Sequence, residues 1–186
     1  MNLVIAFEST YGQAHKIAEH VADHARRQGH VARLVRASAA MPANLEDAEA
    51  FVVVAPVYFG KHARAMRRFL RTYSRTLAKR PLAFVSVSNS AAKTGTEAFA
   101  HAERLAKQAM EAVQLHPLAV ACAAGSLAYP RYGFFVRHMM RLIAKSTGGP
   151  LDPTQIHELT SWERLDADLT PFFAELEARE SVRHAA

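Results

Sequence analysis

The stretch Phe7-Glu8-Ser9-Thr10-Tyr11-Gly12-Gln13-Ala14 decides the fold. It follows an apolar run over 3–7 and precedes an amphipathic segment, so we expect a buried strand that turns directly into a helix. Small hydroxylated residues and Gly12 leave backbone N–H groups pointing at the space above the strand, and the helix N-terminus adds roughly half a positive charge. Such a turn binds phosphate without a Lys or Arg. An ordinary turn in which Ser9 or Thr10 caps the helix is the alternative.

Apolar strand-like runs alternate with amphipathic helical segments along the chain. Strands are expected at 2–7, 30–36, 51–55, 82–88 and 118–124, and helices at 13–28, 62–77, 94–113 and 162–178. Nearly continuous apolar strands with helical crossovers predict a doubly wound α/β fold, in which a five-stranded parallel sheet forms the middle of three layers. Residues 1–186 are expected to form one domain, with a segment of about 126–154 inserted after the fifth strand.

The composition is that of a globular protein, with 186 residues of which 50% are hydrophobic and 22% charged. No apolar run is long enough to span a bilayer and no secretory signal is recognisable, so the cytoplasm is the expected compartment. The single Cys122 excludes an internal disulfide and a Cys-x-x-Cys site. His20 and His24 have metal-ligand spacing but no partner motif, so no metal is expected.

The net charge of +6 is distributed unevenly along the chain. Neither 50–96 nor 112–151 contains an Asp or Glu, whereas both contain several Lys and Arg residues. Such a field suits an anionic partner, either an anionic membrane surface, an acidic substrate or a nucleic acid. Because no recognition motif accompanies the charge, nucleic acid is not expected. Solvated helix faces are the alternative explanation.

Two further loops are expected beside the first, because the carboxyl ends of parallel strands meet at one edge of a sheet. The second is Pro56-Val57-Tyr58-Phe59-Gly60, where two aromatic rings could stack on a planar ring and Gly60 permits close backbone approach. The third, Ser86-Val87-Ser88-Asn89, offers hydroxyl and N–H groups. A phosphate loop beside an aromatic loop favours a flavin over simple packing of the aromatic rings.

These three loops resemble the FMN-binding loops of the flavodoxin fold. The resemblance implies FMN as the cofactor, with its phosphate in the first loop and its ring between the other two. The residues expected to bind it are Ser9, Thr10, Tyr11, Gly12, Gln13, Ala14, Pro56, Val57, Tyr58, Phe59, Gly60, Ser86, Val87, Ser88 and Asn89. Flavodoxin phosphate loops usually end in Thr where this chain has Ala14, so FMN binding is expected to be weaker by roughly 0.5–1.5 kcal/mol.

The stretch Tyr129-Pro130-Arg131-Tyr132 and the basic segment after it are similar to one branch of that family, the menaquinone-dependent protoporphyrinogen IX dehydrogenases. This resemblance implies FMN-dependent oxidation of protoporphyrinogen IX to protoporphyrin IX in haem biosynthesis, with electrons passed to menaquinone or ubiquinone. Substrate contacts are expected from Tyr129, Arg131, Tyr132 and Arg137. No side chain is identified as a catalytic acid or base, because the flavin carries the chemistry.

The inserted segment also has a reading from its residues alone. Two sets of side chains share helix faces, namely Arg137, Arg141 and Lys145 on one and Phe135, Met139, Leu142 and Ile143 on another. Such a helix either lies on a membrane surface, here the cytoplasmic face of the inner membrane, or packs on the core. Three other functions stay open: a flavodoxin-like electron-transfer protein, a generic FMN quinone reductase, and a flavodoxin-fold module that has lost FMN. Homo-oligomerisation also stays open.

Overall fold

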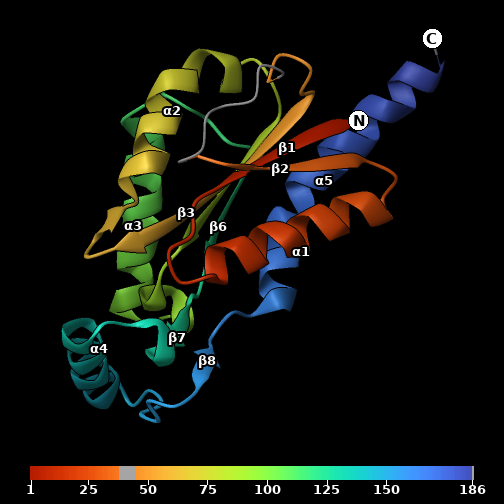
Figure 1. The fold of residues 1–186 in the computed structure, drawn as a ribbon. Helices are drawn as coiled ribbons and strands as arrows, with labels where there is room; N and C mark the ends of the chain where they lie inside the picture. Colours follow the sequence, from red (N-terminus) through yellow and green to blue (C-terminus); the bar gives the residue numbers. More distant parts are fainter. Residues whose placement is uncertain (38–44, 186) are drawn as a thin grey trace.

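A parallel β-sheet runs through the middle of the fold (Figure 1), in a computed structural model that describes residues 1–37 and 45–185. Its parallel strands are β1 (Asn2–Phe7), β2 (Val31–Arg36), β3 (Ala50–Tyr58), β5 (Leu82–Val87) and β6 (Ala119–Ala123). They lie in the order β2-β1-β3-β5-β6. The chain therefore winds outward from β1 in both directions, which confirms the predicted doubly wound five-stranded parallel sheet.

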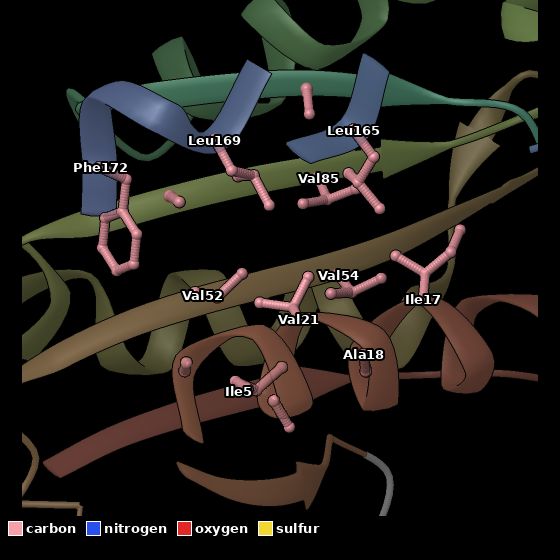
Figure 2. Packing of buried hydrophobic residues seen from close by; sticks show 14 of the residues in the cluster. Ile5, Ile17, Ala18, Val21, Val52, Val54, Val85, Leu165, Leu169 and Phe172 are labelled. Atoms are coloured by element: carbon pink, nitrogen blue, oxygen red, sulfur yellow. The ribbon is translucent and has the colours of Figure 1, made fainter. Parts of the chain in front are cut away.

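Helices cover both faces of this sheet. Helices α1 (Gln13–Arg27) and α5 (Trp162–Ala185) lie on one face, and α2 (Arg64–Leu77) and α3 (Glu97–Glu111) lie on the other (Figure 1). Figure 2 shows the first layer closely, where Val21 and Leu169 from the two helices enclose Val52 and Val85 of the sheet. Because both of their faces are buried, the strands β1, β3, β5 and β6 are almost continuously apolar, whereas the edge strand β2 is partly exposed and contains Arg33 and Arg36. Helix α5 continues beyond the predicted end at residue 178.

The strand β3 is longer than the sequence indicated. It continues to Tyr58 and turns back into the short antiparallel strand β4 (Lys61–His62), so part of the expected second loop is a β-hairpin. The turn consists of Phe59 and Gly60, whose φ angles are +50° and +74°. Two successive positive φ angles are typical of the tight hairpin turn that matches the twist of paired strands. The sequence predicts a strand that ends at residue 55, because proline cannot donate to a sheet ladder, but β3 continues through Pro56 to Tyr58.

The inserted segment after β6 folds at the carboxyl end of the sheet (Figure 1). It contains β7 (Ser126–Ala128), the 3-10 helix η2 (Tyr129–Arg131) and α4 (Phe134–Thr147), and is followed by β8 (Ile156–Glu158). Strands β7 and β8 pair with each other in antiparallel fashion and close the base of the segment. A small core of its own forms around Tyr129, Tyr132 and Ala144. A further 3-10 helix, η1 (Asn89–Ala92), follows β5.

The described residues include neither a membrane-spanning helix nor a metal-binding cluster. Within 1–37 and 45–185, no helix is both long and apolar enough to cross a membrane. The same residues contain no cluster of His, Cys, Asp and Glu that could hold a metal ion. Cys122 is buried in β6, and burial raises the pKa of its thiol to about 11. The reactive thiolate is therefore scarce at neutral pH.

Candidate functional site

A cleft of about 450 Å³ opens at the carboxyl ends of β1, β3 and β5. It brings together the three loops singled out in the sequence, and its volume is typical of a small-molecule site. The first loop contributes Ser9, Thr10, Tyr11, Gln13 and Ala14, the second Pro56, Val57, Tyr58, Phe59 and Gly60, and the third Val87, Ser88 and Asn89. The cleft lies where the strand order reverses, the usual ligand position in doubly wound sheets.

The first loop ends at Gly12, which is the N-cap of α1. Gly12 has φ +101° and provides no side-chain cap. The alternative prediction, in which Ser9 or Thr10 is the N-cap of an ordinary turn, is therefore wrong. Instead the Gly12 N–H donates to Ser9 Oγ at 3.1 Å. The first N–H groups of a helix have no partner within it. With no acidic residue in its first turn, α1 therefore presents donors and a positive dipole end that fit a phosphate.

Side chains from three other parts of the fold fix this first loop in place. Arg36 of β2 donates to Glu8 Oε1 at 3.0 Å and to the Ser9 carbonyl at 2.9 Å. The Tyr58 hydroxyl accepts from the Thr10 N–H at 3.0 Å. The amide of Gln13 donates to Thr160 Oγ1 at 2.8 Å, which turns it toward the segment before α5. The loop is therefore held on both sides before any ligand binds.

The second loop holds Phe59 in an unusual conformation. An aromatic residue seldom adopts a positive φ angle, and such positions concentrate at functional sites. Phe59 is 78% exposed although it lines the cleft. Tyr58 lies beside it, and its ring meets the edge of Tyr11 at 5.8 Å between centroids. Two aromatic rings at the cleft mouth fit a planar ring system better than they fit a buried core.

The third loop separates two serines that looked alike in the sequence. Ser88 lines the cleft, and its buried Oγ has no hydrogen-bond partner among the described residues. Buried hydroxyl groups nearly always have one, so this atom fits a ligand with a polar edge. Ser86 does not line the cleft and lies 2.9 Å from His62 Nε2. Ser86 lies within β5, whereas Ser88 follows the end of the strand at Val87, so only Ser88 belongs to the loop at the cleft.

The buried His62 beneath the loops should make stability depend on pH. Burial, reinforced by the charge of Arg67, lowers the pKa of His62 from 6.5 to about 4. Between these pH values the unfolded chain binds the proton and the folded chain does not, so the free energy of unfolding falls as the pH drops. At about 1.4 kcal/mol per pH unit, we expect a loss of about 2 kcal/mol between pH 7.5 and pH 5.

Urea unfolding at the two pH values checks this expectation. In the His62→Gln variant, which retains a hydrogen-bonding group for Ser86 but does not titrate, stability should fall by about 2 kcal/mol less than in the wild-type chain. Equal losses in the two proteins would show that His62 is not the group responsible.

The four residues predicted to contact substrate occupy four different environments. Tyr132 lines the cleft, and its ring edge meets Tyr11 at 4.8 Å between centroids. Tyr129 is fully buried and donates to the Pro150 carbonyl at 2.9 Å. Arg137 donates to the carbonyls of Tyr129 and Tyr132 at 3.0 and 3.1 Å. Arg131 lies against the first loop and donates to the Tyr11 carbonyl at 2.6 Å. The structure therefore brings Arg131 and Tyr132 to the loops and uses Tyr129 and Arg137 within the inserted segment.

One wall of the cleft comes from α4 and was not identified from the sequence. It consists of Val136, Met139, Met140 and Ile143. Their i, i+3, i+4, i+7 spacing is that of one helix face, so the periodicity carried the signal. Sequence reasoning had instead grouped Met139 and Ile143 with Phe135 and Leu142, which are 85% and 57% exposed and lie outside the cleft. The part of the lining that was not predicted is completed by Ser90, His101, Leu105, Gly125 and Ser126.

The three loops and the inserted segment lie within a region that matches a known protein family. A model of the flavodoxin domain family matches residues 4–154. This chain belongs to the flavodoxin family. Membership of the family confirms FMN as the cofactor, and the uncapped end of α1 and the unpartnered Ser88 hydroxyl fit such a ligand. The match covers the three loops, α4 and the rest of the inserted segment.

Two relatives and one solved structure are similar to this flavodoxin-family chain. Protoporphyrinogen IX dehydrogenase [quinone] of Escherichia coli (strain K12) is 28% identical over 165 residues, which cover 89% of this chain and 91% of the relative. The protein of the same name from Leishmania major is 30% identical over 118 residues, 63% of this chain and 51% of the relative. A mutant flavodoxin from Pseudomonas aeruginosa superposes with a TM-score of 0.51 at 14% identity, over 79% of this chain and 96% of that one. This last likeness concerns the fold alone.

Proposed function

We propose that this chain is an FMN-dependent oxidoreductase that converts protoporphyrinogen IX to protoporphyrin IX in haem biosynthesis and passes the electrons to a quinone. One observation carries the proposal: the cleft joins the three flavodoxin loops to an apolar wall from the inserted segment. Relatives that align over most of the chain bear the name of this activity. The proposal takes 1–186 as one domain, with 126–154 as its substrate-binding insertion.

The flavin contacts follow from the loop geometry. The first loop, Ser9 to Ala14, takes the phosphate on backbone donors at the end of α1. Tyr58 and Phe59 face the ring from the second loop, while Ser88 and Asn89 offer polar groups from the third. Bound FMN would supply the redox chemistry by taking two electrons at a time from the substrate and passing them to the quinone, three times for each six-electron conversion. The protein contributes by holding the reactants together, a large part of catalysis when orientation is accurate.

The substrate contacts come from the inserted segment. A porphyrinogen is a broad, mostly apolar macrocycle that carries anionic propionates. The apolar side chains of Met139, Met140 and Ile143 suit its body, and Tyr132 stands between this wall and the first loop. Burial raises the pKa of Tyr132, so its hydroxyl stays protonated and keeps donating to the Ser126 carbonyl. Tyr132 therefore acts as a rigid aromatic surface.

The outer face of α4 suits the membrane in which quinones dissolve. Phe134 and Phe135 are 80% and 85% exposed, and Leu142 is 57% exposed. The exposed Arg141 and Lys145 lie on the same outward side of the helix, about 180° from the cleft wall at 100° per residue. Apolar side chains flanked by basic ones bind at the interface of an anionic bilayer. We propose that the protein associates peripherally with such a surface through this face.

An anaerobic assay of porphyrinogen oxidation tests the proposed function. Purified FMN-loaded protein is mixed with protoporphyrinogen IX, with and without a menaquinone analogue, and protoporphyrin fluorescence is followed. Sustained turnover is expected only with the quinone. An FMN-loaded protein that leaves the porphyrinogen unchanged but reduces quinone from another donor would instead be a generic quinone reductase. A protein that stays colourless with excess FMN would have lost the cofactor.

A further inference from the structure

Arg131 lies directly on the phosphate loop although it is far from it in the sequence. Its guanidinium donates to the Tyr11 carbonyl at 2.6 Å. A side-chain carbon added to Gly12 would overlap the same guanidinium, so the group covers the end of α1 at the N-cap. No basic side chain occurs within the loop 9–14 itself. Arg131 thus places the positive charge that the loop does not contain beside its backbone donors.

The inserted segment holds Arg131 in this position. Arg131 is the last residue of η2, and Arg137 of α4 binds the carbonyls on both sides of it, those of Tyr129 and Tyr132. The Tyr132 hydroxyl, in turn, accepts from the Ala128 N–H at 3.2 Å and donates to the Ser126 carbonyl. The backbone of η2 is therefore fixed from both ends, and the direction in which Arg131 leaves it is set by β7 and α4.

The chemistry of the guanidinium matches a phosphate in this place. It carries five N–H donors in a planar fork that pairs with phosphate oxygens, and the contact with Tyr11 uses one side of the fork. The loop lacks a hydroxyl at its end, where Ala14 is buried. A charge-assisted hydrogen bond from a guanidinium is stronger than the neutral hydroxyl contact that is missing there.

We propose that Arg131 is a ligand of the FMN phosphate, so that the substrate-binding insertion also holds the cofactor. This inference rests on the FMN site of the proposed function. It gives Arg131 a role different from that expected from the sequence, a contact with the substrate. A phosphate bound there would be shared by the first loop and η2, so the cofactor would tie the inserted segment to the loop that Arg131 already contacts.

Titrations with two flavins that differ only in the phosphate test this role. Binding of FMN and of riboflavin to the apoprotein is followed by quenching of flavin fluorescence. In Arg131→Gln the FMN Kd should rise roughly ten- to hundredfold, as expected for loss of a charged hydrogen bond, while the riboflavin Kd stays within about twofold. Arg131→Lys should lie between the two proteins, since it keeps the charge and loses the fork. The matched control is Arg68→Gln, which removes the same charge from an exposed position on α2 and should leave both Kd values unchanged.

The possible outcomes separate this inference from the proposed function. An unchanged FMN Kd in Arg131→Gln would overturn the inference while leaving the FMN site intact. Equal weakening of FMN and riboflavin would also overturn it, because Arg131 would then only support the fold of the loop. If wild-type protein bound neither flavin at high micromolar concentration, the proposed function would fail before the variants were compared.

Discussion

Replacing Gly12 with valine is expected to abolish FMN binding while leaving the sheet folded. Gly12 adopts φ +101°, a conformation that costs a residue with a side chain about 1–3 kcal/mol and a β-branched residue the most. The added side chain would also push the Arg131 guanidinium off the loop. Relief of both conflicts requires the loop to move, which takes several phosphate donors away together. At roughly 1.5–3 kcal/mol for each charged hydrogen bond, the FMN Kd should rise at least a hundredfold.

The chain offers a matched control for this change. Gly29, just after the C-terminal end of α1, has φ +85° and nothing within 4 Å of an added side-chain carbon. Gly29→Val therefore introduces similar backbone strain at a position remote from the cleft. Thermal unfolding should show comparable destabilisation of the two variants, and only Gly12→Val should be colourless after incubation with FMN and removal of the unbound flavin by gel filtration. If both lost FMN, general instability would be the cause, and Gly12 would have no specific role at the phosphate.

Placing carboxylates on the cleft wall should remove porphyrinogen oxidation without removing the flavin. In the double variant Met139→Asp/Ile143→Asp, two acidic groups replace apolar side chains that line the cleft. Burying each polar group beside a bound macrocycle costs about 1–3 kcal/mol, and the new charges also repel the propionates. We expect kcat/KM for protoporphyrinogen IX to fall at least a hundredfold and the FMN Kd to change less than threefold.

The outer face of the same helix supplies the control. Phe135→Asp/Leu142→Asp adds the same charges at exposed positions outside the cleft. With a water-soluble quinone analogue, this variant should oxidise porphyrinogen normally, and sedimentation with anionic vesicles should show that it no longer binds them. The Met139/Ile143 variant should still bind the vesicles. Full porphyrinogen activity in the Met139/Ile143 variant would mean that α4 is not the substrate wall, and a generic flavin reductase would become the better description.

The sequence predicts the site well where the ends of the strands determine which loops are neighbours. Parallel strands bring their carboxyl ends to one edge, so the sequence alone assigns the loops after β1, β3 and β5 to one site. Thirteen of the fifteen predicted flavin-site residues line the cleft, the exceptions being Gly12, which caps α1, and Ser86. Ser86 was misjudged for a simple reason. The strand continues through it, and alternation turns its hydroxyl toward His62.

The inserted segment was harder to predict because its packing depends on contacts distant in sequence. Periodicity identified the helix but not which of its faces meets the cleft, since apolar residues occupy both. Tyr129 and Arg137 have side chains typical of ligand contacts, yet here they serve the segment's own core and the carbonyls of η2. The contact between Arg131 and Tyr11 joins residues 120 positions apart. No local pattern encodes such a contact.

The pairing of β7 with β8 allows the length of the inserted segment to vary independently of the central sheet. These two short strands clamp the insertion at its base, so the chain between them is a closed loop whose ends are already fixed. The entropy of closing such a loop grows slowly with length, by only about 0.6 kcal/mol for each doubling. Beyond η2, which holds Arg131 on the first loop, the segment up to β8 can therefore change in length with little penalty to the sheet. If the inserted segment binds the substrate as proposed, one flavin scaffold could take a different substrate by exchange of this segment alone.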